Sequence, residues 1–360
     1  GKDDAAMAEA AADPAALRRT MHGAPLWARA ATVAAGPVFN FVLSILVFGA
    51  VLMSNGEARD PLTVGEMRPL PFAQDGLQSG DVILAIEGTP LPEADGAGYD
   101  AFLAGLPARA SLQYTVQRDG ADVLTEGPYL MPPLAVAVSP QSAALEAGIE
   151  RGDVITAVNG APIYAFDQLR EAVEGGQGAP LALQIWRDGE TLDKTLTPKR
   201  TDEPDPEGGF RTHWRIGIAG GWAFEPATEQ ADVLSAISGG AAQTWRIIEG
   251  SITGLGYMIT GAISTCNLSG PIGIAQTSGA MASAGLVDFI WFIAVLSTAV
   301  GLLNLFPIPA LDGGHLVFYA YEAVTGRPPS DRALRILMAV GLTLVLSLMV
   351  FALGNDLFCP

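Results

Sequence analysis

The sequence predicts a membrane protein with an α-helical core of three transmembrane helices, into which two copies of an α+β domain are inserted. Uncharged stretches over residues 30–56, 289–311 and 336–355 predict the helices. Each stretch is long enough to cross a hydrocarbon core of about 30 Å, which needs about 20 helical residues. A duplicated pattern between the first two stretches predicts the inserted domains.

The charge distribution separates the middle of the chain from the spans. The 360 residues carry a net charge of −18, and most acidic residues lie between Glu57 and Asp232. An acidic, water-exposed region fits soluble domains better than membrane loops. The same net charge argues against nucleic acid as a partner, because phosphate groups require a basic surface.

Positively charged residues orient the spans, because cytoplasmic loops carry an excess of Lys and Arg. Arginines precede the first span and occupy the short loop between the last two, at Arg18, Arg19, Arg29, Arg327, Arg332 and Arg335. We therefore expect cytoplasmic loops over residues 1–29 and 312–335, and a periplasmic middle region and C-terminus. Cys266 and Cys359 would then both lie outside, where disulfides can form, and whether they pair stays open.

The middle region contains an internal repeat. Leu77–Leu91 and Ile149–Ile163 match at an offset of 72 residues, with seven of fifteen positions identical, including a Gly-Asp-Val-Ile run. Alternating strands follow over residues 112–120 and 181–189, and each ends in Asp-Gly, a strong hairpin signal. Residues 166–175 have helical spacing. The repeated unit therefore combines strands with a helix.

The second copy of this unit resembles PDZ domains of the bacterial protease-associated type over Val138–Ile163, and the first copy is degenerate over Met67–Ile83. We expect PDZ domains over residues 60–130 and 131–200. PDZ domains bind extended peptides at a sheet edge. Peptide binding, steric filtering of bulky substrates and inert spacing all stay open as roles.

Residues 201–287 are predicted to form a periplasmic linker with an interfacial amphipathic helix. Helical spacing of apolar residues over 241–264 predicts that helix. The Gly and Pro content of Asn267–Gln276 argues against a simple helix there.

The first span contains three residues that are unusual in a membrane helix. Gly36 and Pro37 are expected to break its first turns, and Asn40 places an amide inside the bilayer. The simplest interpretation of Asn40 is a kinked helix whose amide bonds a neighbouring carbonyl.

The second span, over 288–311, runs into the motif "NLFPIPALDGGH". Pro307 and Pro309 each remove a backbone donor. A chain broken at membrane depth is tolerated where it is buried in protein or lines a wet cavity. The glycines after Asp312 are expected to let another backbone or a ligand approach closely. From the residues alone, Asp312 could be a metal ligand, a proton relay or a buried hydrogen-bond acceptor.

The motif matches the Asn-x-x-Pro-x-Pro-x-Leu-Asp-Gly-Gly pattern of the site-2 protease family of intramembrane zinc metalloproteases. "AAGPVFNF", the PDZ pair and "LSGPIGIAQ" occur in the same order in the bacterial branch of that family. The resemblance implies a Zn²⁺ ion held by two histidines of an HExxH helix and by Asp312. It further implies that Asn304, Pro307, Pro309 and Asn40 bind the substrate.

The sequence departs from this family in one respect. Its histidines are His22, His213 and His315, and none lies in an HExxH pattern, so no catalytic residue is assigned. We expect the chain to be truncated, with a fourth transmembrane helix upstream that carries HExxH. His315 is expected to support the site rather than bind zinc.

The leading hypothesis is intramembrane proteolysis in a bacterial inner membrane. The substrate would be a single-pass membrane protein such as an anti-sigma factor, or a signal-peptide remnant. An alternative is an inactive PDZ scaffold that binds exposed peptide termini. A transporter with Asp312 as its ion site is disfavoured, because transporters usually have more spans and an inverted repeat.

Overall fold

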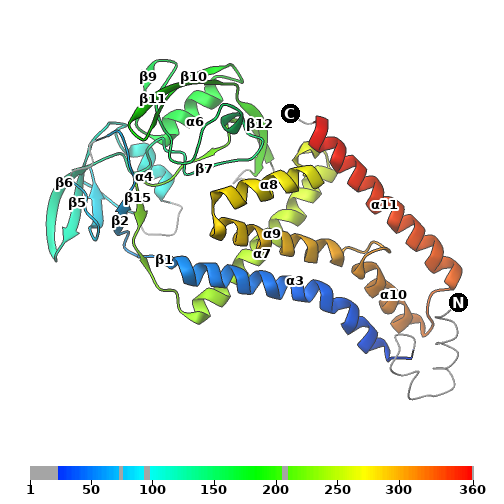
Figure 1. Cartoon of the computed structure of the whole chain (residues 1–360). Helices are drawn as coiled ribbons and strands as arrows, with labels where there is room; N and C mark the ends of the chain where they lie inside the picture. Colours follow the sequence, from blue (N-terminus) through cyan, green and yellow to red (C-terminus); the bar gives the residue numbers. More distant parts are fainter. Residues whose placement is uncertain (1–22, 73–75, 93–97, 205–209, 359–360) are drawn as a thin grey trace. The chain divides into compact units, whose positions relative to one another are not determined.

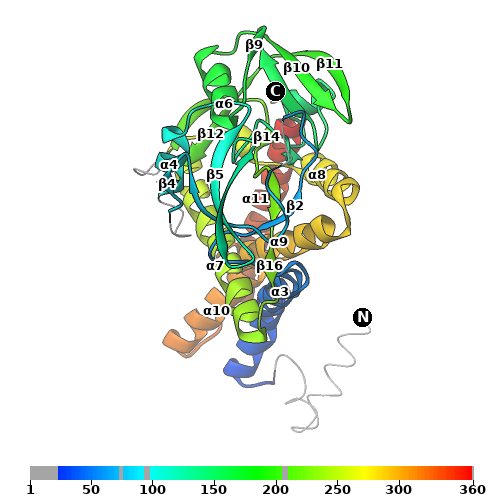
Figure 2. The same ribbon diagram turned by 90° about the vertical axis from the view of Figure 1, so that its left-hand side faces the viewer.

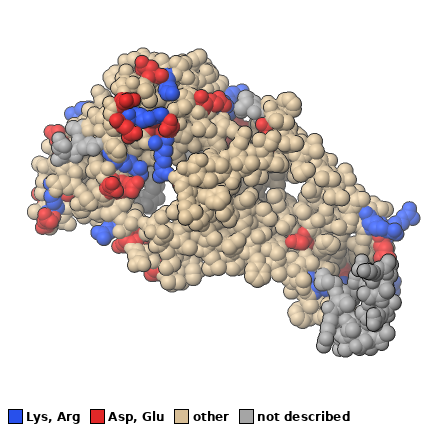
Figure 3. Space-filling model, in the orientation of Figure 1, with Lys and Arg blue, Asp and Glu red and all other residues tan. Residues whose placement is uncertain are grey.

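The computed structural model describes residues 23–72, 76–92, 98–204 and 210–358, and the chain forms two compact units. A helical unit comprises the described residues up to Leu52, Asp232–Thr260 and those from Thr265 onwards. A β-rich unit comprises Met53–Ala231 with Gly261–Ser264. Figure 3 shows that most of the visible charged side chains lie on the β-rich unit, whereas the surface over α8 and α9 is almost free of them.

The described part of the helical unit contains α3 and, later in the chain, the helices from α7 to α11 (Figure 1). Among the described residues, α3, α9 and α11 are long and apolar enough to cross a membrane, with mean hydropathies of 2.1, 2.2 and 2.7. The three predicted spans are therefore confirmed as long apolar helices. The unit contains α3 (Leu26–Asn55), α7 (Val233–Ile259), the short turn η1 (Thr265–Asn267), α8 (Pro271–Ala284), α9 (Leu286–Leu305), α10 (Asp312–Thr325) and α11 (Asp331–Phe358).

Two expectations about proline and glycine in this unit were wrong. Helix α3 runs without interruption through Gly36 and Pro37, because packing against neighbouring helices can compensate for the lost backbone donor. Pro271 begins α8 instead of preventing a helix. At the first helical position the missing amide hydrogen costs no hydrogen bond within the helix.

Other segments differ from the expected bounds. Residues 312–335, expected as a loop, contain α10. The helix expected over 241–264 begins earlier, at Val233, because Asp232 caps it by accepting from the amides of Leu234 and Ser235 at 2.7 and 2.8 Å. Of the expected loop over 1–29, residues 1–22 lie outside the described residues, and Leu26 already belongs to α3. Cys266 is disulfide-bonded, and Cys359 lies outside the described residues.

The described β-rich unit contains two four-stranded antiparallel sheets (Figures 1 and 2). Their strand orders correspond: β4-β3-β5-β6 in the first and β9-β8-β10-β11 in the second. Helix α4 packs on the first sheet and α6 on the second. The first set is β3 (Val82–Ile86), β4 (Thr89–Pro90), α4 (Tyr99–Gly105), β5 (Leu112–Arg118) and β6 (Ala121–Gly127). The second set is α5 (Ala143–Glu146), β8 (Val154–Val158), β9 (Ala161–Pro162), α6 (Phe166–Gly175), β10 (Leu181–Arg187) and β11 (Glu190–Leu196).

Both predicted Asp-Gly hairpins are confirmed. Asp119 and Gly120 have φ values of 51° and 80°, and Asp188 and Gly189 have 48° and 93°. Two consecutive residues with positive φ make the turn that matches the twist of paired strands. The turns join β5 to β6 and β10 to β11.

The aspartate of each Gly-Asp-Val-Ile run forms a buried ion pair with the arginine that ends the following long strand. Arg118 Nε and Nη2 donate to Asp81 at 2.7 Å each, and Arg187 Nε and Nη2 donate to Asp153 at 2.6 and 2.7 Å. Asp81 and Asp153 are 1% and 0% exposed. The aspartate and the arginine that the two copies share therefore have the same structural role, because a carboxylate this deeply buried requires a charged partner.

Residues 210–229 do not form the linker that was expected. β14 (Ile218–Ala219) pairs with β7 (Ala137–Val138), and β15 (Phe224–Pro226) pairs with β2 (Val64–Met67). Ile216 and Phe224 are buried in the second and first cores. The segment therefore packs against both sheets, because its apolar residues contribute to both cores. The remaining short strands are β1 (Glu57–Ala58), β12 (Lys199–Pro204), β13 (Phe210–Arg215) and β16 (Thr228–Glu229).

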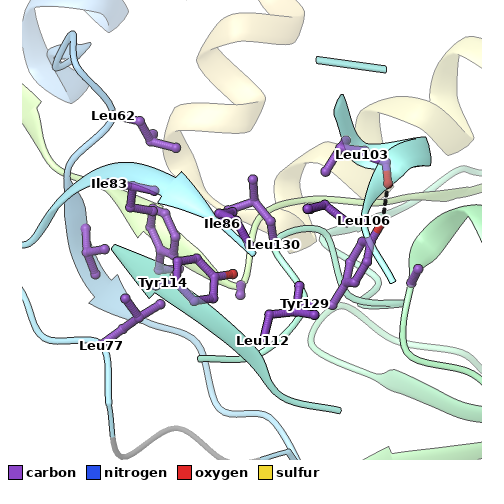
Figure 4. Packing of buried hydrophobic residues seen from close by; sticks show 14 of the residues in the cluster. Leu62, Leu77, Ile83, Ile86, Leu103, Leu106, Leu112, Tyr114, Tyr129 and Leu130 are labelled. Atoms are coloured by element: carbon purple, nitrogen blue, oxygen red, sulfur yellow. Dashed lines mark hydrogen bonds between the residues drawn. The ribbon is translucent and has the colours of Figure 1, made fainter. Parts of the chain in front are cut away.

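The first core is built around two tyrosines whose hydroxyl groups are satisfied (Figure 4). Tyr114 is fully buried and donates to the carbonyl of Pro128 at 2.6 Å, and Tyr129 donates to the carbonyl of Leu103 at 2.7 Å. Burial of these rings is inexpensive because each polar atom has a partner. Burial also raises the pKa of the Tyr114 hydroxyl.

Candidate metal and substrate site at the helix break

The predicted break in the second span is confirmed. Helix α9 ends at Leu305 and α10 begins at Asp312, with six non-helical residues between them, here called the break (306–311). Pro307 and Pro309 lie within it and have no amide hydrogen to continue the helix. The break is ordered by its own turns, in which the amide of Ile308 donates to Phe306 O at 2.7 Å and that of Leu311 to Ile308 O at 2.8 Å.

The two glycines of the motif pack directly on the break, as expected. A Cβ atom on Gly313 would lie 2.3 Å from the carbonyl oxygens of Leu305 and Phe306, and one on Gly314 would lie 2.3 Å from that of Ile308. Real Cβ contacts do not approach this closely. Both positions therefore require glycine for the first turn of α10 to lie against the break.

Asp312 is the first residue of α10 and is half-buried. A carboxylate is favourable at the positive end of a helix dipole. Its Oδ2 lies beside α3, 3.2 Å from where a Cβ on Gly36 would stand. Among the described residues, none donates a hydrogen bond to this carboxylate, so the acceptor role considered above gains no support.

The residues described here supply only part of a metal site. No three His, Cys, Asp or Glu side chains cluster among them. His315 packs edge-on against Phe318 at 6.0 Å, His213 lies 3.4 Å from Glu174 in the β-rich unit, and His22 lies outside the described residues. A single carboxylate suits zinc chemically as one ligand of three or four. Asp312 therefore fits one position of a zinc site.

Asn40 and Asn304 lie close to the same junction of α3 and α9. Ser297 Oγ of α9 donates to Asn40 O at 3.0 Å, and a Cβ on Gly301 would lie 3.0 Å from Asn40 Cβ. Asn304 follows Gly301 by one helical turn and is half-buried. Asn40 in turn follows Gly36, the neighbour of Asp312, by one turn. Gly36, Asn40, Gly301 and Asp312 therefore lie at one junction of α3, α9 and α10, and Asn304 lies one turn further along α9.

An ion pair that the sequence did not reveal joins α3 to α10. Arg29 Nη2 and Nη1 donate to the two carboxylate oxygens of Glu322 at 2.6 and 3.2 Å. The Arg29 guanidinium also lies 5.3 Å from the centroid of the Tyr319 ring. This pair braces the two helices that carry Gly36 and Asp312. Charges 293 positions apart leave no local pattern by which the contact could be found.

Known proteins resemble this chain over most of its length. The model of peptidase family M50 matches residues 4–348. A relative from Rhizobium meliloti, named "Putative zinc metalloprotease", is 34% identical over 340 residues, covering 94% of this chain and 72% of its own. Regulator of sigma-E protease RseP of Salmonella typhimurium is 32% identical over 379 residues, covering 95% and 81%. RseP of Escherichia coli is 32% identical over 365 residues, covering 91% and 78%.

The family match spans nearly the whole chain: it includes α3, α9, most of α11 and the break with its aspartate. Family M50 comprises the zinc-dependent site-2 proteases. Residues 1–360 therefore belong to peptidase family M50, as a membrane metalloprotease whose cofactor is zinc.

Proposed function

We propose that this protein cleaves a single-pass membrane protein within the bilayer, with Asp312 as one zinc ligand. The observation that carries the proposal is the half-buried Asp312 carboxylate, which has no donor among the described residues and stands where the membrane helix is broken. The remaining zinc ligands would be the two histidines of an HExxH helix outside this sequence, whose glutamate would be the general base. When bound, zinc lowers the pKa of a coordinated water to about 7 and polarises a carbonyl.

The break would hold the substrate as an extended strand. A peptide bond inside a helix is shielded, so a transmembrane substrate must unwind before it can be hydrolysed. Pro307 and Pro309 interrupt the helical hydrogen-bond ladder at the end of α9, and backbone groups of the break would pair with the substrate backbone. Asn304 and Asn40 would add side-chain amides at the same end of the break. Together these groups would replace the hydrogen bonds that the substrate loses on unwinding.

The two sheets of the β-rich unit would act as periplasmic PDZ domains. In the second, β14 pairs with β7 among the described strands and leaves its other edge for an added peptide. Helix α6 lies beside this segment, since a Cβ on Gly220 would stand 2.6 Å from the Phe166 ring. A peptide bound here would be a substrate terminus; a peptide-free domain would instead filter bulky substrates.

The biological setting follows by analogy. The relatives from Salmonella typhimurium and Escherichia coli bear the name regulator of sigma-E protease, which supports an anti-sigma factor as substrate. A signal-peptide remnant would present the same chemistry. The protein would be a multi-pass component of the bacterial inner membrane, surrounded by lipid. The apolar surfaces of α3, α9 and α11 support this placement.

The test uses the full-length protein and two aspartates that both begin a helix. Asp312→Asn should lower zinc content and abolish cleavage of a model transmembrane substrate. Asp331→Asn, in the first turn of α11, should retain both. Full zinc content and cleavage in the Asp312 variant would refute its ligand role. A wild-type protein without zinc or cleavage would instead support the inactive scaffold.

A further inference from the structure

Helix α11 touches the break at Gly341. This glycine is buried, and a Cβ built on it would lie 2.8 Å from the amide nitrogen of Ala310 and 3.2 Å from Cβ and Cδ of Pro309. The nearest of these atoms belongs to the backbone and cannot rotate away. Glycine in a helix interior is destabilising relative to alanine. The close approach of α11 to the break gives a reason for bearing that cost.

The same part of the break is covered from a second side by α10. A Cβ on Gly314 would lie 2.5 Å from Cα of Pro309. Pro309 is therefore held between Gly314 of α10 and Gly341 of α11. Gly314 lies two residues after Asp312, whereas Gly341 belongs to a separate helix. A displacement of α11 at this point must move the break, since packed backbone has no free volume to absorb it.

The far end of α11 is fixed by the "LSGPIGIAQ" motif. The Asp356 carboxylate accepts from the amides of Gly270 and Ile272, at 2.8 and 2.9 Å, where α8 begins. A carboxylate at a helix N-terminus is favourable because it satisfies free amides and complements the dipole. A Cβ on Gly270 would stand 2.5 Å from Asp356 Oδ2, so the motif's glycine makes room for the carboxylate. This attachment limits sliding of α11 along its axis.

We propose that Gly341 is a positioning residue for the protease reaction. It allows α11 to lie against Pro309 and Ala310, and so sets the position of the backbone on which the substrate strand is held. The proposal rests on the proposed function, because it requires that the break bind substrate. A purely structural glycine would affect folding but would leave substrate affinity in the folded enzyme unchanged.

The experiment compares two glycines of the same helix in the full-length enzyme. Gly341→Ala meets the break, whereas Gly354→Ala has no atom within 4 Å of its new methyl group. Helix propensity favours alanine equally at both positions, so their difference reports the contact. We expect Gly341→Ala to lower kcat/KM about tenfold, mainly through a higher KM, because a displaced break forms weaker backbone hydrogen bonds with the substrate strand. Zinc content should equal that of Gly354→Ala.

Equal KM values in the two alanine variants would overturn the proposal. If Gly341→Ala does not fold, Asp356→Asn tests the proposal, because it weakens the far attachment of α11 without adding volume. It should raise KM above the wild-type value by less than tenfold, and an unchanged KM would overturn the proposal. A wild-type enzyme and Gly354→Ala variant that both fail to cleave would instead refute the proposed function.

Discussion

Arg187→Met should destabilise the β-rich unit strongly, although the arginine lies at the surface. Asp153 is completely buried, and Arg187 is its charged partner through contacts of 2.6 and 2.7 Å. Methionine keeps much of the apolar stem and removes the charge, which leaves a buried carboxylate uncompensated. Loss of one member of a buried pair costs about 3–5 kcal/mol, and the 26% exposure of Arg187 places it near the lower figure.

The expected loss can be converted into a melting temperature. For a unit of this size, 1 kcal/mol corresponds to about 2–4 °C, so a loss of about 3 kcal/mol lowers Tm by about 6–12 °C. Circular dichroism of the detergent-solubilised protein measures the transition. Arg170→Met is the matched control, because Arg170 pairs with Asp167 at 2.9 Å on the exposed face of α6. That pair contributes about 0.5 kcal/mol at most, or about 2 °C.

A double variant separates the lost charge from lost packing. Asp153→Asn combined with Arg187→Met removes the uncompensated charge, and its Tm should recover part of the loss seen in the single variant. The reasoning is refuted if Arg187→Met lowers Tm no more than Arg170→Met does. It is also refuted if the double variant is less stable than Arg187→Met alone.

Two further predictions concern Gly36 and Asp81. In Gly36→Ala the new methyl would stand 3.2 Å from Asp312 Oδ2, closer than the ordinary 3.4–4 Å. With Asp312 as the proposed zinc ligand, a chelator should withdraw zinc from this variant several-fold faster than from the wild type. Gly49→Ala meets α7 instead and should release zinc at the wild-type rate; equal rates in the two variants would contradict the prediction. Burial raises the pKa of Asp81, but the hydrogen bonds from Arg118 and the Gln78 amide outweigh it and hold the pKa below its usual value. The unfolded carboxyl then binds protons more readily than the folded one. This stabilisation is therefore present above about pH 4 and is lost as the pH falls through the lower pKa of the folded state. Tm measured against pH for the wild type and Asp81→Asn should differ in that acid range, and parallel curves would contradict the assignment.

Local chemistry made several features predictable. Uncharged runs long enough to span a bilayer predict α3, α9 and α11, because a helix in lipid satisfies its own backbone. The hairpins at Asp119 and Asp188 follow from the positive φ that the turn demands. The break at Pro307 and Pro309 follows from missing amide hydrogens.

Other features were decided by tertiary contacts. Pro37 lies inside α3 and Pro271 begins α8, because the effect of a proline depends on its neighbours and on its position within a helix. The pairing of β14 and β15 is not predictable from the local sequence, since their partners lie about 80 and 160 residues away. The assignment of Asp312 to zinc came from family resemblance and stays a prediction.

The sequence by itself determined which helices are long and apolar enough to cross a membrane, where one of them breaks and which aspartate stands at that break. Those properties depend on hydropathy, backbone chemistry and short-range order. Only the tertiary structure decided what surrounds the break: Gly36 beside Asp312, Gly341 on Ala310, and the ion pair of Arg29 with Glu322. The physical reason is that glycine has no Cβ atom, so another segment can pack closely against it. That segment comes from a distant part of the chain and leaves no local signal in the sequence.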